Sequence, residues 1–236
     1  MVLCEKKQKR CAEHELQEAG NQWDHRAVAA ESKLVVSLRV GKRTYDHTLT
    51  LVQDTKERLR KNHLPAIFTD TFASYESALL EVFGRRYPAP GKSRLPVLRW
   101  RQGLAYGQVK KVYKRGRVDG VEVRVVHGKT KLKHVLYLLG YKQINTSVVE
   151  RHNGRSRLRN QRQVRKTLAF SKALRYHRWM SWLSVGLYNF CRAHHSLRIK
   201  ESGRVRHRSP AMAAGLTDHV WTIREWLLKP AFGRQR

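Results

Sequence analysis

Two acids in this chain have the type and position that could do chemistry. Asp70 follows a short apolar run, residues 66–68, that reads as a buried strand. Ligands of open α/β sheets gather beyond the carboxyl ends of strands. Glu150 falls in the first turn of an arginine-rich helix that we expect to begin near Asn145. Carboxylates among cations stay ionised, because nearby positive charge lowers their pKa.

Ionised carboxylates that meet in one fold suit Mg²⁺, which prefers oxygen ligands and keeps several waters. A metal pair could activate a water or a 3′-hydroxyl and stabilise the leaving oxygen of a phosphodiester. Asp70 and Glu150 are therefore the candidate catalytic and metal-binding residues.

Each acid also has a purely structural interpretation. Asp70 could terminate a strand before a turn, as aspartate often does. Glu150 could be the return partner of a capping box begun by Ser147, and the helix dipole favours an acid there. Taken singly, these interpretations are favoured. The residues alone indicate a basic α/β protein that binds nucleic acid.

Charge is the strongest compositional signal. Lys and Arg total 49 against 18 Asp and Glu, which gives a net charge of +31. A surplus of this size repels itself unless a polyanion is present, so nucleic acid is the expected partner. A membrane fits poorly, because no stretch has the apolar length of a spanning helix. The basic residues are also not confined to one amphipathic helix.

Basic residues concentrate in two segments. The stretch that follows Glu150 has no acid and supplies Arg151, Arg155, Arg157, Arg159, Arg162, Arg165 and Lys166. Two predicted strands, 104–112 and 121–126, are joined around Asp119-Gly120 and form a hairpin. Its candidate phosphate contacts are Lys110, Lys111, Lys114 and Arg115. An exposed edge hairpin that uses lysine against aggregation is an equally good interpretation.

The remaining pattern predicts the elements that must position these residues. Alternation over residues 34–40 indicates a half-buried strand, and helices are predicted over 44–59 and 74–83. With the strand before Asp70, this order implies a mixed sheet with helices on its faces. Residues 85–100 have the proline and glycine content of a linker. Short helices are expected at residues 209–211 and 222–228.

A long helix is predicted over residues 171–191. Four residues are expected to be buried on it, namely Leu174, Trp182, Val185 and Phe190, with Trp179 and Tyr188 beside them. Exposed tryptophans could stack on bases. At this helical spacing we favour a core position for Trp179 and Trp182.

The cysteines indicate a reducing compartment. Cys4, Cys11 and Cys191 are odd in number and widely spaced, so a cytoplasmic protein is expected. Nucleic acid as the expected partner makes a nucleoid-associated location the expectation. Cys4, Cys11 and His14 lack paired zinc-ligand spacing, and an ordinary loop is favoured there.

Several blocks of the chain, taken in order, resemble bacterial DDE transposases of the insertion-sequence-one family. Residues 23–25, 32–37 and 40–44 are similar to the family's first sheet segment. Phe68-Thr69-Asp70, with Tyr75 and Ala78, resembles its second-aspartate motif, and residues 145–153 resemble its glutamate helix. Residues 166–172, 188–194 and 209–217 match its downstream blocks.

This resemblance implies an RNase H-like, retroviral-integrase-like fold, in which a mixed sheet is flanked by helices. It implies two Mg²⁺ ions and the cleavage and strand transfer of an insertion sequence. Asp70 corresponds to the second acid, Glu150 to the third, and Arg151 and Asn153 to the helix face that approaches DNA. The partners implied are transposon ends, target DNA and further copies of the chain.

The resemblance also divides the chain. The expected parts are an N-terminal loop (1–22), the first part of the RNase H-like domain (23–84), a basic hairpin insertion (85–144), the glutamate helix with the helix that follows (145–195), and a basic C-terminal tail with short helices (196–236).

One departure from the family bears on activity. The family's first aspartate lies in a stretch that resembles Asp-Glu-x-Trp-Ser-Phe-Val. That stretch directly precedes a Lys-Lys-Gln segment, which residues 6–8 match here. We therefore expect the sequence as given to lack that acid and to be nearly inactive alone. Asp24 is not assigned as its replacement, because its motif matches the second strand. The alternatives are a DNA-binding remnant that represses transposition and a general basic nucleic-acid protein.

Overall fold

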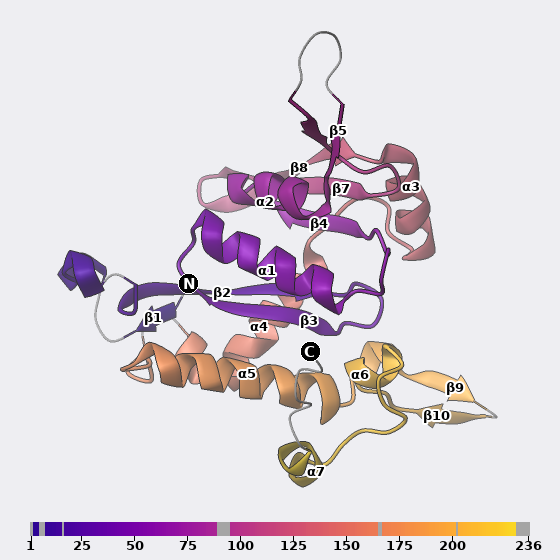
Figure 1. Ribbon diagram of the computed structural model, residues 1–236. Coiled ribbons are helices and arrows are strands. Elements are labelled where there is room, and N and C mark those ends of the chain that lie inside the picture. Colours follow the sequence, from indigo (N-terminus) through magenta and orange to yellow (C-terminus); the bar gives the residue numbers. More distant parts are fainter. Residues whose placement is uncertain are drawn as a thin grey trace. The chain divides into compact units, whose positions relative to one another are not determined.

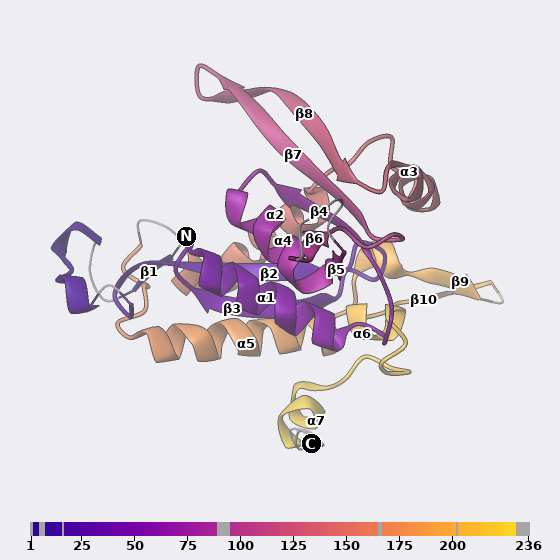
Figure 2. The same cartoon turned by 45° about the horizontal axis from the view of Figure 1, so that its top comes forward.

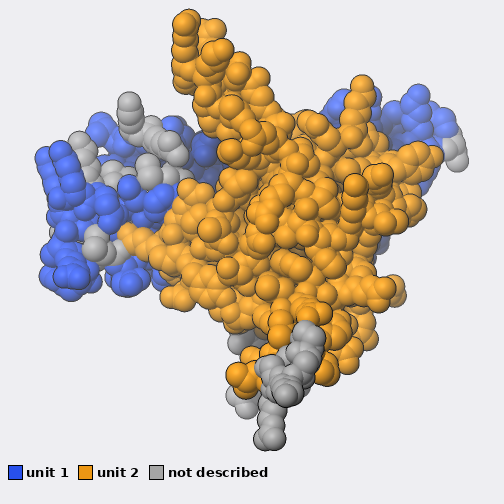
Figure 3. All heavy atoms as spheres, turned by 90° about the horizontal axis from the view of Figure 1, so that it is seen from above, with its two compact units in different colours: residues 1–41, 152–236 blue, residues 42–151 orange. Residues whose placement is uncertain are grey.

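The computed structural model describes residues 2–4, 8–15, 17–88, 95–164, 167–201 and 203–229. The chain forms two compact units, which Figure 3 distinguishes by colour. The first unit comprises residues 1–41 and 152–236, and the second comprises residues 42–151. The division falls within one helix, α4 (Ser147–Arg159).

The first unit is built on an antiparallel sheet. In it β2 (Gly20–Val28) lies between β1 (Val2–Cys4) and β3 (Val35–Gly41). The prediction of a strand over residues 34–40 is confirmed. The prediction of a loop over residues 1–22 is corrected by β1, which is too short to show a period in the sequence.

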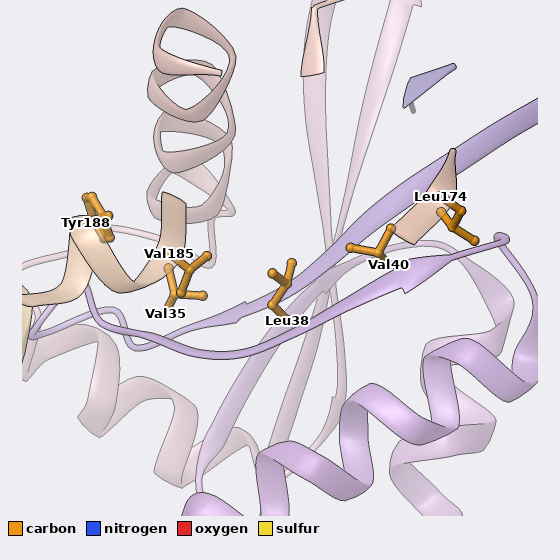
Figure 4. Close-up of a cluster of buried hydrophobic side chains, with 6 residues drawn as sticks. All are labelled: Val35, Leu38, Val40, Leu174, Val185 and Tyr188. Carbon is orange, nitrogen blue, oxygen red and sulfur yellow. The ribbon is translucent and has the colours of Figure 1, made fainter. Parts of the chain in front are cut away.

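Helix α5 (Leu174–Phe190) packs against β3 and closes the core of this unit (Figures 1 and 4). Figure 4 shows Val35, Leu38 and Val40 of β3 meeting Leu174, Val185 and Tyr188. The Asn189 side chain bonds both the N–H and the carbonyl of Val35, each at 3.0 Å. The side chain of Val35 is buried, as is that of Leu38, so the predicted half-exposed alternation is wrong.

Short elements complete the first unit. They are η1 (Gln8–Arg10), η2 (Glu13–Glu15), η3 (Gln161–Gln163), η4 (His195–Leu197), β9 (Ile199–Glu201), β10 (Arg204–Arg206), α6 (Pro210–Ala213) and α7 (Ile223–Leu228). The two predicted short helices are confirmed as α6 and α7. Their caps are Ser209 and Thr222, whose hydroxyl oxygens accept backbone N–H bonds.

The second unit is a mixed sheet between helices. Strand β7 (Ala105–Lys114) pairs parallel with β4 (Ala66–Asp70) and antiparallel with β8 (Arg117–His127). One face is covered by α1 (Tyr45–Arg58) and α2 (Ala73–Phe83), through a cluster that includes Phe83 and Tyr106. The other face is covered by α3 (Lys129–Leu138) and Ile144. This confirms the predicted α/β class.

The segment predicted as a linker contains a small hairpin. Strands β5 (Arg85–Tyr87) and β6 (Val97–Arg99) pair antiparallel. Residues 89–94 between them lie outside the described residues. Prolines at 88 and 96 flank the strands rather than interrupt them, which is where proline is compatible with a ladder.

The long hairpin turns four residues earlier than predicted. Lys114 pairs with Arg117, and Arg115 and Gly116 between them have φ of 50° and 78°. Positive φ at both positions is typical of a type I′ turn, whose twist suits a two-residue hairpin. Asp119-Gly120 lies inside β8. The first half of β7 is a strand of the sheet, and β7 and β8 then continue as a twisted ribbon (Figure 2).

Candidate metal and nucleic-acid site

Asp70 is the last residue of β4, at the carboxyl end of the strand. Its register partner on the parallel strand is Val109, so the two side chains lie on the same face of the sheet. That face is the one that α3 covers, because Val109 packs with Leu132. The Asp70 carboxylate is 59% exposed. One oxygen accepts the Phe72 N–H at 3.1 Å, and the other lies 3.7 Å from the Arg43 guanidinium.

Glu150 stands in the first turn of α4 and is bound by two donors. Oε2 accepts from Lys111 Nζ at 2.6 Å, and Oε1 accepts from the Thr146 hydroxyl at 2.6 Å. The predicted capping box with Ser147 is wrong, because Ser147 is already helical and its hydroxyl donates to Asn145. Partial burial raises the pKa of Glu150, but Lys111 and Thr146 outweigh it and hold that pKa below its ordinary value.

The structure places the two acids on one face of one sheet. Lys111 follows Val109 by two residues on β7, and residues two apart on a strand share a face. Asp70 lies beside Val109, and Glu150 is bonded to Lys111. Both carboxylates therefore stand where β4 ends and β7 continues. Each is met by a cation: Arg43 lies near Asp70, and Lys111 is paired with Glu150.

Carboxylate oxygens of this kind fit a magnesium ion that keeps several of its waters. Within the described ranges, no group of three or more His, Cys, Asp or Glu side chains gathers as a metal site. Asp70 and Glu150 are both partly exposed and could supply one oxygen each. Lys111 would have to release Glu150 first.

The ribbon lysines are engaged with acids on opposite faces. Lys110 pairs with Glu122 at 3.0 Å, while Lys111 pairs with Glu150. Lys114 and Arg115 lie exposed at the tip, and no acid partner is found for them in the part of the chain that the structure describes. The tip is therefore the part of the ribbon best suited to meet a phosphate backbone.

Helix α4 presents its arginines to solvent. Arg151, Arg157 and Arg159 are exposed, whereas Arg155 is half-buried and bonded to His194. Asn153 is not directed outward, because its Oδ1 accepts from Arg26 at 2.8 Å.

The last predicted contacts follow α4. Arg162 lies in η3 and donates to Ser171 at 3.3 Å. Arg165 and Lys166 lie outside the described residues.

A buried polar network around Asp24 was not anticipated from the sequence. Asp24 Oδ1 lies 2.7 Å from His177 Nε2. Oδ2 accepts from Gln163 at 2.6 Å, Arg26 at 2.9 Å and Ser181 at 3.1 Å. Burial raises the pKa of Asp24, but His177 and Arg26 outweigh it and hold the pKa below its ordinary value. The network ties β2, η3 and α5 together.

Ser181, His177 and Asp24 have the residue types of a hydrolytic triad but not its geometry. Ser181 and Asp24 both approach the same nitrogen, His177 Nε2, at 3.4 and 2.7 Å. A triad needs the two ring nitrogens to serve the two partners separately. Ser181 and His177 are also 0% exposed, so no substrate reaches them. The network is structural.

His152 is buried on α4 without a hydrogen-bond partner for either ring nitrogen among the described residues. Its ring lies edge-on to Tyr188 at 4.5 Å between centroids. Burial, with the positive charges of Arg26 and Arg155, lowers the pKa of His152 to about 3. The ring is therefore neutral in the folded protein at neutral pH.

A cavity of about 720 Å³ lies between α2 and the ribbon, on the sheet face opposite the two acids. Gln108 and Lys110 line it, and they alternate along β7 with the residues of the acids' face. Its charges are largely balanced, since Arg124 pairs with Glu76 at 3.3 Å and Lys110 with Glu122. The cavity is thus distinct from the candidate metal site.

No protein-family model, curated protein or solved structure matches this chain. Within the described residues, no helix has the length and apolar content needed to cross a bilayer.

Proposed function

We propose that this chain is a DNA transposase of the DDE type, with Asp70 and Glu150 as two of its metal-binding carboxylates. The observation that carries the proposal is that two acids lie on the same face of β7. Asp70, at the end of β4, is next to Val109, and Glu150, in the first turn of α4, is bonded to Lys111. The ordered resemblance to insertion-sequence-one transposases supplies the family. The net charge of +31 supports DNA as the partner.

An RNase H-like fold is part of this proposal. Two features support it, each within one unit. The first unit has antiparallel strands β1, β2 and β3 at the start of the chain. In the second unit, a strand that ends in the candidate acid pairs parallel with a later strand, and helices cover both faces.

In the proposed reaction, Asp70 and Glu150 hold Mg²⁺ and the basic segments hold DNA. When bound, the metal would activate a water or a 3′-hydroxyl and stabilise the leaving oxygen of the phosphodiester. Glu150 is kept ionised by Lys111 and Thr146, so it is ready to accept a cation without losing a proton. The ribbon tip and the exposed α4 arginines would each contact DNA phosphates, and several copies of the chain would assemble on the DNA.

Two carboxylates hold a metal pair poorly, so we expect little strand transfer from this chain alone. A second candidate, a DNA-binding repressor without catalysis, is favoured by a specific observation. Glu150 is already paired with Lys111, and no third metal-binding side chain joins the two acids among the described residues. Both candidates predict DNA binding, and they differ in metal binding and cleavage.

Metal binding and DNA cleavage should be measured separately. We expect the chain to bind Mn²⁺ weakly in an electron paramagnetic resonance titration, and Asp70→Asn or Glu150→Gln to abolish that binding. Glu122→Gln is the matched control, because Glu122 is also an exposed acid paired with a ribbon lysine but lies on the other face. Equal Mn²⁺ binding by all four proteins would exclude these acids as ligands.

The same proteins should be tested on DNA. Wild type, Asp70→Asn and Glu150→Gln are expected to bind a duplex equally, since the acids make no phosphate contact. Nicking of the duplex by the wild type that disappears in both variants supports the enzyme. Binding without nicking supports the repressor. Efficient joining of DNA ends by the isolated chain would show that the expectation of low activity is wrong, and failure to bind DNA would exclude both candidates.

A further inference from the structure

The outward face of α5 carries large aromatic side chains that the core does not cover. Tyr176, Trp179 and Trp182 are 43%, 62% and 42% exposed. The expectation that Trp182 is buried and that Trp179 is core is therefore wrong. The core face of α5 is formed by other residues, among them Leu174 and Val185. Tyr176, Trp179 and Trp182 form an aromatic stripe on α5.

The aromatic stripe follows the helix axis. Tyr176, Trp179 and Trp182 are three residues apart and Gly186 follows four residues later, and residues at that spacing are neighbours on a helix surface. Gly186 marks the far end of this line, where a side chain would collide with the ring of Trp226 from α7. The same helix face thus already binds one aromatic ring of the chain's own at its C-terminal end.

Positive charge accompanies the aromatic rings. Arg175 and Arg178 are exposed on the same helix, and the Arg175 guanidinium lies 4.9 Å from the ring centre of Tyr176. The sequence of α5 contains no Asp or Glu. In the described part of the chain, no acid lies within ion-pair distance of either arginine. The surface is therefore both aromatic and cationic.

An occupant of this surface must supply flat rings and negative charge together. A symmetric contact through α5 of a second copy would add two more arginines to the interface, and α5 has no Asp or Glu to balance them. An apolar protein surface would cover the tryptophans but leave the arginines without counter-charge. A nucleic-acid strand offers bases for stacking and a phosphate for each base. In a duplex the base faces are hidden in their own stack, so an unpaired strand fits best.

We propose that the aromatic stripe, with Arg175 and Arg178, is a binding surface for single-stranded nucleic acid. Bases stack on the exposed rings, and the two arginines neutralise adjacent phosphates. Such stacking tolerates any base sequence, because every base has a π face. The surface lies in the first unit and uses neither Asp70 nor Glu150. This proposal therefore does not depend on the proposed metal chemistry.

The proposal is tested with a labelled oligothymidine, an oligouridine and a duplex of equal length, by fluorescence anisotropy. Trp179→Leu with Trp182→Leu should weaken oligothymidine binding about tenfold or more, since stacking contributes strongly for each base. Duplex binding should stay within about twofold. Trp179→Phe with Trp182→Phe should retain most of the affinity, because phenylalanine still stacks.

Tyr137→Leu is the matched control, since Tyr137 is an 82% exposed aromatic on another helix, α3. It should leave oligothymidine binding unchanged. Arg175→Gln with Arg178→Gln should reduce the slope of log affinity against log salt by about 1.4, because each single-strand phosphate contact contributes roughly 0.7. Oligouridine tests whether the unpaired strand is DNA or RNA.

Two results would overturn the proposal. Equal oligothymidine affinity for the wild type and the leucine variant, with no quenching of tryptophan fluorescence, would show that nothing stacks on the aromatic stripe. A wild-type dimer that the leucine variant converts to monomer, with oligothymidine binding intact, would assign the surface to a second copy instead. Circular dichroism of the leucine and phenylalanine variants checks that both remain folded.

Discussion

Lys110 and Lys111 are neighbours on β7 but belong to different surfaces. Successive side chains on a strand point to opposite faces. Lys110 accordingly meets Glu122 beside the cavity, and Lys111 meets Glu150 on the acids' face. In the sequence, Lys110 and Lys111 look like one DNA contact, but each lysine forms its own ion pair on its own face of the strand.

Lys111 competes with a metal ion for Glu150, which leads to the first prediction. Lys111→Gln should raise the affinity for Mn²⁺ severalfold, because it removes both the competing ion pair and a repelling charge. Lys110→Gln should leave that affinity unchanged. An electron paramagnetic resonance titration measures both. The same increase in both variants would mean that only net charge matters, and no increase in either would argue against Glu150 as a ligand.

His152 gives the second prediction, on stability against pH. The unfolded chain takes up a proton on this residue below its ordinary pKa of 6.5, whereas the folded chain resists protonation down to about 3. The stabilisation is therefore complete above pH 6.5 and is lost as the pH falls from 6.5 toward 3. The slope for one such group approaches about 1.4 kcal/mol per pH unit.

Urea unfolding at several pH values between 7 and 4 measures this slope. His152→Phe keeps the ring contact with Tyr188 and removes the titration, so its stability should fall less steeply with acidity. Asp24, whose pKa is lowered in the fold, also loses stabilisation in acid and contributes to both proteins alike. Identical pH profiles for wild type and His152→Phe would contradict the prediction.

At the scale of elements, the join between β8 and α3 depends on Gly128. This residue caps α3 with φ of 70°, and an added Cβ would collide with the Leu104 carbonyl and lie 2.9 Å from Ala105 Cα. Leu104 and Ala105 are 0% exposed, so neither can move easily. Two separate factors therefore favour glycine at this position: the positive φ and the lack of space for a Cβ atom.

The third prediction separates these reasons. Gly128→Ala should lower the free energy of unfolding by well over 2 kcal/mol, because the left-handed backbone costs roughly 1–2 kcal/mol before the overlap is added. Gly140→Ala is the control, since Gly140 also has positive φ, 66°, but nothing lies near its Cβ position. Its cost should be limited to the backbone term. Equal losses by urea denaturation would rule out the collision.

At the scale of the whole molecule, the dominant quantity is the charge of +31. A protein that contacts several phosphates releases counterions, so its affinity falls steeply with salt. Among the helices that the structure describes, α4 has the most exposed arginines, namely Arg151, Arg157 and Arg159.

The fourth prediction follows from these arginines. Changing all three to Gln should reduce the slope of log affinity for duplex DNA against log salt by about 2.7, at roughly 0.9 per phosphate contact. Arg58→Gln should change the slope little, because Arg58 is already paired with Asp54 at 3.1 Å. Anisotropy titrations from low to high salt measure both slopes. An unchanged slope in the triple variant would remove α4 from the DNA interface.

The sequence by itself determined the properties that depend on composition and local period. These are the excess of positive charge, the helices around Val52 and Leu79, the apolar strand before Asp70, and the short helices near residues 210 and 223. The position of the hairpin turn was missed, because Asp119-Gly120 has stronger turn residues than Arg115-Gly116, and the pairing of Lys114 with Arg117 outweighs that local preference.

Only the tertiary structure decided which surfaces these elements share. The parallel pairing of β4 with β7 brings Asp70 and Glu150 to one face, although they are far apart in sequence. The packing of α5 on β3 buries Val185 and leaves Trp179 exposed, although both fit a helical period. The physical reason is that a period specifies which residues share a face. Elements distant in sequence determine whether that face is covered.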